Sequence, residues 1–166
     1  MAFGLLEVIE QGVEGSFCIL YDLLNRHPDI ACERAFAPWP DLEQYLRNHG
    51  QPLTSLESAL PLREFDVIGF SLQYELNYTG VLNILDLAGL PFRAADRGSD
   101  LPLVIGGGPC ALNPEPLAEF FDAFVLGDGE EVILEICREA IASMETRESK
   151  NELLEKLSLL EGVYVP

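Results

Sequence analysis

The sequence predicts an α/β fold, a doubly wound and mostly parallel sheet of about five strands of the flavodoxin or Rossmann-like type. Two observations predict it. Short apolar runs alternate along the chain with segments in which apolar residues recur at helical spacing. The run Phe65–Leu72 is apolar almost throughout, which is typical of a central parallel strand buried on both faces. Such alternation requires right-handed crossovers, so helices should cover both faces of the sheet.

The expected strands are bounded by polar residues and turn formers. They are Phe3–Ile9, Ile30–Ala37, Phe65–Leu72 and two apolar runs that begin at Leu103 and at Asp122. Glu33 and Arg34 make the second strand polar in its second half, which indicates a place near an edge of the sheet. The closing segment Gly162–Pro166 also resembles a strand, and from it we expect the chain to be a piece of a longer protein.

Helices are predicted between the strands from apolar spacing and from end signals. They are Phe17–Asn25, Leu42–Asn48, a segment through Leu82, Leu85 and Ala88, a segment from Glu130 to about Met144, and an amphipathic segment with Leu153, Leu154, Leu157 and Leu160. Ser16 and Asp41 are the expected N-caps of the first two, because their side-chain oxygens can accept free amide groups of the first turn. Pro28 stops the first helix, and Gly50 and Gly89 end the next two.

Charge and cysteine usage exclude several classes of partner. The chain of 166 residues carries 28 acidic and 10 basic side chains, a net charge of −18, which repels nucleic acid and anionic membranes. No apolar run approaches the ~18–20 residues that span a bilayer. Met1–Val8 lacks the features of a signal peptide. The four cysteines form no C-x-x-C pair, so we expect free thiols and a cytoplasmic protein.

Glycine-rich and polar segments follow three of the expected strands, and they form the candidate site. Ligands of open α/β sheets bind outside the carboxyl ends of the strands, where glycine lets a bound molecule approach the backbone. The candidate residues are Glu10, Gln11, Gly12, Ser71, Gln73, Tyr74, Asn77, Gly106, Gly107, Gly108, Gly127, Gly129 and Glu130. Packing or helix capping is an equally open role for the polar ones. No catalytic or metal-ligating residue is predicted.

A nucleotide site is a further alternative, because Gly106-x-Gly108-x-x-Ala111 formally matches a dinucleotide fingerprint. The pattern follows a late strand, however, and the proline at 109 prevents an immediate helix. We therefore favour a role for these glycines in a sharp turn or in close approach to a flat ligand. The acidic residues Asp128 and Glu130 lie at a helix start, where the helix dipole also stabilises them.

Two motifs carry a family resemblance. Pro102–Pro109, followed by Phe124–Glu131, resembles the N-terminal cobalamin-binding-like domain of radical S-adenosylmethionine proteins. Arg34–Asp41 and Phe65–Leu76 closely resemble one uncharacterised subfamily of these iron–sulfur oxidoreductases. The similarity extends over nearly the whole chain. It implies a Rossmann-like, cobalamin-binding-type domain over residues 1–144, then a linker and amphipathic helix over 145–166 that lead to a C-terminal radical barrel.

That barrel, absent from this chain, would be its partner and would carry the [4Fe–4S] cluster and S-adenosylmethionine. The chain departs from the family pattern in two ways. It lacks the cluster motif C-x-x-x-C-x-x-C, so it should not be catalytic alone, although the parent protein would be an enzyme. It also lacks Asp-x-His-x-x-Gly and offers Glu10-Gln11-Gly12 in the first loop. Any cobalamin would then be held without a protein imidazole on the metal, or the cofactor has been lost.

The resemblance therefore implies a domain that holds a corrinoid or shapes access to the barrel. A ligand-free docking domain and a nucleotide-binding enzyme domain stay open as alternatives. The docking domain predicts a carboxyl-edge crevice filled by its own side chains, and exposed apolar surface where the barrel would pack.

Overall fold

The strands form one sheet in the order β2-β1-β3-β4-β5-β6 in the computed structural model, which describes residues 3–9 and 17–166. The strands are β1 (Phe3–Ile9), β2 (Ile30–Phe36), β3 (Val67–Ser71), β4 (Leu103–Gly107), β5 (Ala123–Val125) and β6 (Val163–Tyr164). β1 to β5 are parallel, which confirms the predicted doubly wound fold. β6, which lies in the closing segment that resembled a strand, pairs antiparallel with β5, so the sheet has six strands where about five were predicted. The order 2-1-3-4-5 is that of flavodoxin-like folds, whose connections reverse direction between β1 and β3.

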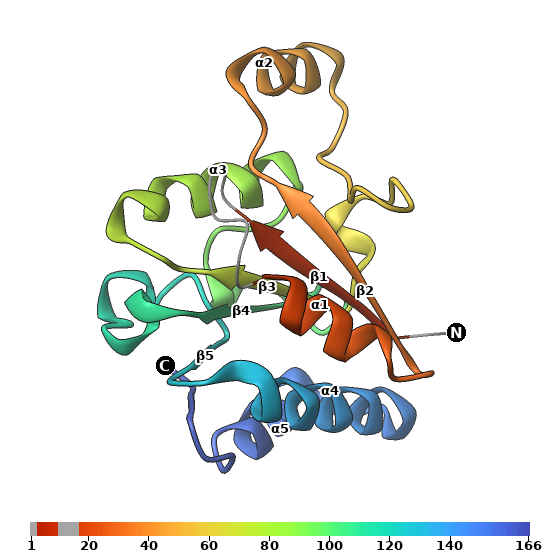
Figure 1. Ribbon diagram of the computed structural model, residues 1–166, viewed down its shortest axis with the longest axis vertical. Coiled ribbons are helices and arrows are strands. Elements are labelled where there is room, and N and C mark those ends of the chain that lie inside the picture. Colours follow the sequence, from red (N-terminus) through yellow and green to blue (C-terminus); the bar gives the residue numbers. More distant parts are fainter. Residues whose placement is uncertain (1–2, 10–16) are drawn as a thin grey trace.

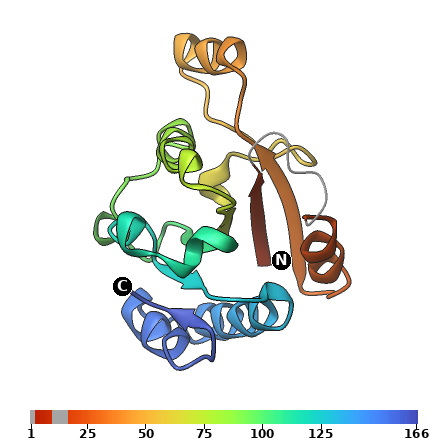
Figure 2. The same ribbon diagram turned by 60° about the vertical axis from the view of Figure 1, so that its left-hand side comes forward.

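Helices cover both faces of this sheet (Figures 1 and 2). They are α1 (Phe17–Asn25), α2 (Pro40–His49), α3 (Tyr78–Leu87), α4 (Gly129–Thr146) and α5 (Lys150–Leu157). Short 3-10 turns complete the connections at η1 (Leu62–Glu64), η2 (Glu75–Asn77), η3 (Ala94–Asp96), η4 (Pro109–Leu112) and η5 (Glu115–Leu117). No helix in the described parts of the chain is long and apolar enough to cross a membrane.

Alternating side chains of the strands divide the core between the two faces. Ile68 of β3 and Val104 of β4 pack with residues of α3, whereas Val67 and Ile105 pack with residues of α1, α4 and α5. Because successive strand residues point to opposite faces, an apolar run without polar interruption is buried on both. This is why Phe65–Leu72 could be recognised as central: β3 lies between β1 and β4.

The start of α2 differs from the prediction. The helix begins at Pro40 with Trp39 at the N-cap position, so Asp41 lies inside the first turn and is not the cap. Proline is favoured at the first helical position, because its missing N–H would be unpaired there anyway and its φ is already helical. The predicted end is confirmed, since Gly50 has a left-handed φ of 59°. Ser16, the expected cap of α1, lies outside the described residues.

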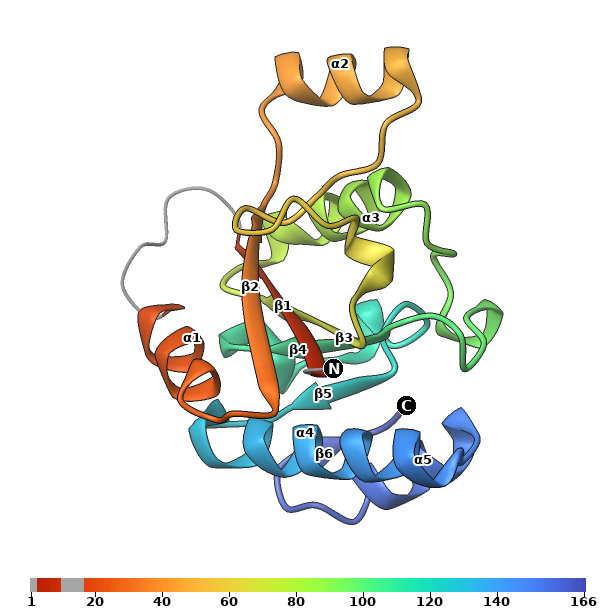
Figure 3. The same ribbon diagram turned by 90° about the vertical axis from the view of Figure 1, so that its right-hand side faces the viewer.

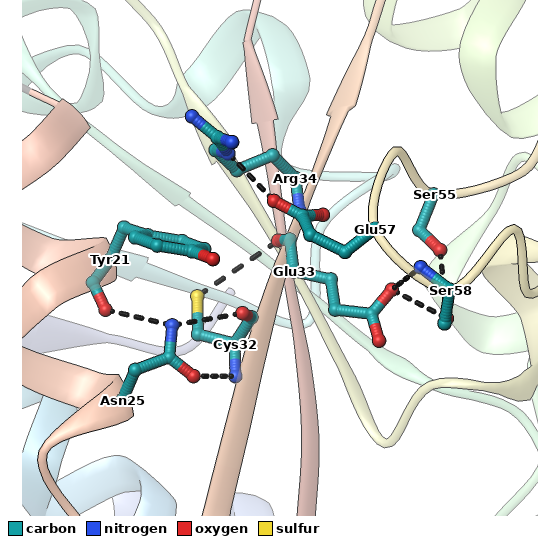
Figure 4. A network of polar contacts seen from close by, with 8 residues as sticks. All are labelled: Tyr21, Asn25, Cys32, Glu33, Arg34, Ser55, Glu57 and Ser58. Atoms are coloured by element: carbon teal, nitrogen blue, oxygen red, sulfur yellow. Dashed lines mark hydrogen bonds and ion pairs between the residues drawn. The ribbon is translucent and has the colours of Figure 1, made fainter.

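β2 lies at an edge of the sheet, as predicted. The loop that precedes η1 covers this edge (Figure 4). The backbone N–H and the Nε of Arg34 each donate to Glu57, both at 2.8 Å. The Oγ of Ser58 donates to Glu33 at 2.6 Å, and the backbone N–H of Leu56 donates to the Arg34 carbonyl. Two residues earlier on the same free edge, the side chain of Asn25 bonds both backbone groups of Cys32. The loop therefore satisfies part of an edge that would otherwise invite pairing with another chain.

A buried charge network joins β5 to α5. Asp122 accepts hydrogen bonds from the backbone N–H of Val104 at 2.8 Å and from Arg97 at 3.2 Å. Its second oxygen lies 2.7 Å from Nζ of Lys150 and pairs with it through charge rather than through a well-directed hydrogen bond. Arg97 also donates to the carbonyls of Pro91, Phe92 and Phe120. The buried charges are thus paired, as burial requires, although Nε of Arg97 has no hydrogen-bond partner among the described residues.

Helix α2 projects beyond the carboxyl end of β2 and stands apart from the sheet (Figure 3). It is held chiefly by α3, where Arg47 pairs with Asp86 and donates to Asn83. The apolar side chains of its outer surface stay exposed. We define the outer face of α2 as Trp39, Leu42 and Tyr45, which are 67%, 47% and 49% exposed.

Candidate functional site

A crevice of about 560 Å³ opens at the carboxyl ends of β3, β4 and β5, on the side of the sheet covered by α1 and α4. It lies next to the point where the connections reverse direction, the usual ligand position in such sheets. The lining residues are Leu20, Leu24, Gly69, Phe70, Ser71, Gln73, Ile105, Gly106, Gly107, Gly108, Pro109, Leu112, Val125, Gly127, Asp128, Gly129, Glu130 and Ile133.

The floor of the crevice lacks a side chain at Gly107. Gly107 lies two residues after Ile105, so a side chain there would project on the same face as that crevice residue. A Cβ at Gly107 would meet only Val125, at 3.9 Å, and its φ is not left-handed. The crevice therefore reaches the backbone of β4 because Gly107 has no side chain. The backbone conformation at this position would accept other residues.

The neighbouring glycines have different physical reasons. A Cβ at Gly106 would lie 3.0 Å from side-chain atoms of Leu72 and Phe124, on the opposite face of the sheet. Gly108 has a φ of 94° and lies against the backbone of Leu72, so a side chain there would be strained. Core packing therefore explains Gly106 and the turn explains Gly108, whereas Gly107 leaves space.

The side walls are apolar. Leu20 and Leu24 of α1 are one helical turn apart and face the crevice together, and Ile133 contributes from α4. With Ile105 and Val125 of the sheet they form a surface that suits the face of an apolar ligand.

The rim is acidic. Asp128 and Glu130 are the ionisable residues among the described lining, which includes no Lys, Arg or His. Asp128 is the N-cap residue of α4, yet its side chain makes no capping hydrogen bond. Among the described residues, neither carboxylate has a side-chain hydrogen bond or ion pair.

The structure brings together most of the predicted site residues. Those that line the crevice are Ser71, Gln73, Gly106, Gly107, Gly108, Gly127, Gly129 and Glu130. Tyr74 and Asn77 do not: Tyr74 is half exposed, and Asn77 is buried with neither side-chain amide atom hydrogen-bonded. Glu10, Gln11 and Gly12 lie outside the described residues.

The apolar walls of the crevice could not be predicted from the sequence. Leu20, Leu24 and Ile133 look like ordinary core positions of amphipathic helices. They line the crevice because α1 and α4 pack beside each other. This contact between helices distant in sequence cannot be predicted from a local pattern. The sequence placed Asp128 at the start of a helix. The structure adds that its side chain makes no capping hydrogen bond.

Among the described residues, the lining shows neither a serine–base pair nor a metal-ligand cluster. No hydrogen bond joins Ser71 to a base there, and no cluster of three His, Cys, Asp or Glu in that part of the chain could hold a metal ion. Cys137, on α4, is fully buried, and burial raises the pKa of its thiol to about 12. It therefore stays a protonated core side chain at neutral pH.

Two comparisons bear on the origin of this arrangement. A family model described as "Radical SAM proteins, N-terminal" matches residues 16–166. The uncharacterized protein MJ0966 of Methanocaldococcus jannaschii is 32% identical over 84 residues, which cover 49% of this chain. The same alignment spans only 17% of the length of that relative.

Proposed function

This chain belongs to the family of N-terminal domains of radical SAM proteins, and we propose that it holds a corrinoid in the carboxyl-edge crevice, at the approach to the catalytic part of its parent protein. The observation that carries the proposal is the crevice itself, whose floor at Gly107 is left bare. A domain that served only for docking would be expected to fill this space with its own side chains.

The residues of the crevice fit a corrinoid as a flat ligand. Such a ring has broad apolar faces and amide groups along its edge. Leu20, Ile105, Val125 and Ile133 would contact the faces, and Ser71, Gln73 and the rim would meet the edge. When bound, the group supplies a cobalt centre for methyl transfer or electron transfer. None of the described lining residues is an imidazole, so the chain's contribution would be to orient the ring and exclude water.

The radical chemistry belongs, in this proposal, to another part of the parent protein. The sequence has no C-x-x-x-C-x-x-C motif. We therefore assign the [4Fe–4S] cluster and S-adenosylmethionine to a catalytic barrel that follows residues 145–166. In the chain described here, α5 packs against α4 and β6 extends the sheet.

The test is a titration of the purified chain with hydroxocobalamin, followed by the visible spectrum and the melting temperature. We expect a shift of the absorption bands and a rise in melting temperature, since a ligand that binds only the folded state stabilises it. Gly107→Leu should abolish both effects by filling the floor, and Gly107→Ala should weaken them. Ala142→Leu introduces the same side chain at an exposed position of α4 away from the lining and should leave binding intact. No change in either readout for the unmodified chain contradicts the proposal.

A nucleotide is a less suitable occupant. Phosphate sites use Lys, Arg or free amide groups at a helix N-terminus. Here the described lining has no basic side chain, and the uncapped amide groups at the start of α4 stand beside two carboxylates that would repel a phosphate. A dinucleotide should accordingly produce no thermal shift under conditions in which the corrinoid does.

A second function, docking of the catalytic part, is favoured by the outer face of α2. Trp39, Leu42 and Tyr45 form an exposed apolar surface on a helix that projects from the sheet. Large exposed apolar surfaces mark interaction sites. Leu42→Glu combined with Tyr45→Glu should prevent the catalytic part, supplied in trans, from co-purifying with the chain. Leu159→Glu, at an 84% exposed residue after α5, serves as the control and should leave association unchanged.

A further inference from the structure

The connection between β3 and α3 has its polar and apolar side chains in reversed places. Leu76 is 87% exposed, whereas the next residue, Asn77, is 2% exposed. Neither Nδ2 nor Oδ1 of Asn77 has a hydrogen-bond partner among the described residues. A buried amide without a partner costs free energy, and so does a leucine side chain left in water. Both residues would therefore be more stable in a different arrangement of this connection.

Helix capping does not explain why Asn77 is buried. It is the N-cap residue of α3, where an asparagine side chain normally accepts a hydrogen bond from an amide group of the first turn. Here its backbone is helical, with φ −75° and ψ −16°, and its side chain makes no capping bond. Buried side-chain amides are hydrogen-bonded in most folded proteins. The unpaired amide of Asn77 therefore points to a partner that another state of the molecule supplies.

The connection leaves the sheet beside the crevice. Ser71 and Gln73 line the crevice, and η2 (Glu75–Asn77) follows after the extended residue Tyr74. The side chains of Tyr74 and Glu75 are exposed. η2 packs chiefly against α3, the helix that continues it. A short exposed segment with little packing, attached at the edge of a binding site, has the properties of a mobile flap.

We propose that Tyr74–Asn77 is a flap that turns over when a ligand enters the crevice. In the closed state the amide of Asn77 faces the polar edge of the ligand, and the side chain of Leu76 packs against the ligand. Both costs are removed together, because the amide gains a partner and the leucine leaves water. The flap goes beyond the proposed corrinoid binding and rests on it for the identity of the ligand.

The amide of Asn77 matches the chemistry of that ligand. An asparagine side chain donates hydrogen bonds through Nδ2 and accepts them through Oδ1. The primary amides along the edge of a corrin ring do the same, so one such amide can pair with both atoms of Asn77 at once. Leucine, which has a similar size, can make neither bond.

The principal test replaces Asn77 in the 166-residue chain by leucine. Two quantities are measured: the melting temperature without ligand, and the dissociation constant from a titration with hydroxocobalamin. We expect Asn77→Leu to raise the melting temperature by at least about 2 °C, because the cost of the unpaired amide disappears. We expect it also to raise the dissociation constant at least about tenfold, because the ligand loses its partner. A residue with a purely structural role would not stabilise the chain and weaken binding when it is replaced.

Leu76→Ser tests the other half of the exchange. Leu76 is 87% exposed without ligand, so the melting temperature should change by less than about 1 °C. The dissociation constant should rise at least about fivefold, because the closed flap loses an apolar contact. Leu159→Ser is the matched control, since Leu159 is 84% exposed and lies after α5, away from the crevice. It should change neither quantity.

The outcomes separate the flap from corrinoid binding. If the unmodified chain shows no binding of hydroxocobalamin, both proposals fail. If it binds, and either Asn77→Leu or Leu76→Ser binds as tightly, corrinoid binding stands and the flap is overturned. A lower melting temperature of Asn77→Leu overturns the flap as well, because the amide would then stabilise the chain without ligand.

Discussion

Gly106 and Gly107 are adjacent in β4, yet a methyl group at each has a different effect. At Gly106 the Cβ would lie 3.0 to 3.1 Å from Leu72, Phe124 and Phe121, in a packed core. At Gly107 it would make one ordinary contact at 3.9 Å. We expect Gly106→Ala to lower the free energy of unfolding by about 1–3 kcal/mol through overpacking, and Gly107→Ala to change it by less than about 0.5 kcal/mol. Urea unfolding of both variants checks this, and equal losses would contradict the assignment of the two faces.

Cys137 makes stability depend on alkaline pH. Burial raises the pKa of its thiol from 9.0 to about 12, so the unfolded chain ionises this group before the folded chain does. The stabilisation is fully present below pH 9 and is lost as the pH rises from 9 towards 12, at about 1.4 kcal/mol per pH unit. Urea unfolding at pH 8, 9 and 10 should show this decline. In Cys137→Ala the decline should be shallower, whatever the variant loses at pH 8. Equal slopes would exclude the thiol as its cause.

At the scale of elements, Asp122 fastens α5 and the segment before β4 to the sheet. Its side chain is 1% exposed and faces both Arg97 and Lys150. Asp122→Ala would leave two cations without their partner, so we expect a loss of about 3–5 kcal/mol in the free energy of unfolding. Glu119→Ala is the matched control. Its pair with Arg93 is more than 60% exposed on both sides and should contribute about 0–1 kcal/mol. Similar losses in urea unfolding would contradict this view of the buried network.

Elements that depend on local pattern were predictable, and those that depend on distant partners were not. The uninterrupted apolar run in Phe65–Leu72 and the polar Glu33 and Arg34 placed β3 at the centre and β2 at the edge correctly. β6 is only Val163 and Tyr164, and it exists because it pairs with β5. A strand of two residues is too short to show a periodicity from which its place in the sheet could be predicted.

The candidate site divides in the same way. Glycines at the end of β4 and after β5 mark where strands end, which is why Gly106–Gly108, Gly127 and Gly129 could be predicted to line the crevice. The walls from α1 and α4 required knowledge of how two helices distant in sequence pack. Asn77 was predicted as a site residue because it follows a strand end. Its side chain is buried and does not line the crevice, so a position near a strand end is not sufficient to predict a residue that lines the crevice.

At the scale of the whole molecule, acidity is the dominant electrostatic property. The excess of 28 acidic over 10 basic side chains gives −18, and most acidic groups cannot find a basic partner. Helix α4 illustrates the consequence, since Glu135 lies one turn from both Glu131 and Glu139. Like charges at this spacing destabilise a helix by a few tenths of a kcal/mol. The same field opposes anions at the rim of the crevice and strains the folded chain by self-repulsion.

Salt should therefore stabilise this protein. We expect the melting temperature to rise by about 2–4 °C between 0.02 and 0.3 M NaCl at pH 7.5, as screening relieves about 1 kcal/mol of repulsion. The triple variant Glu135→Gln, Glu145→Gln and Glu155→Gln reduces the charge from −18 to −15 at exposed positions. It should melt higher than the unmodified chain at low salt, and its salt dependence should be smaller. Sucrose, which favours the folded state without screening charge, should raise both melting temperatures equally. An equal salt response in both proteins would point to exclusion of salt from the surface. Relief of charge repulsion instead predicts a smaller response in the variant, so that the two melting temperatures converge as salt rises.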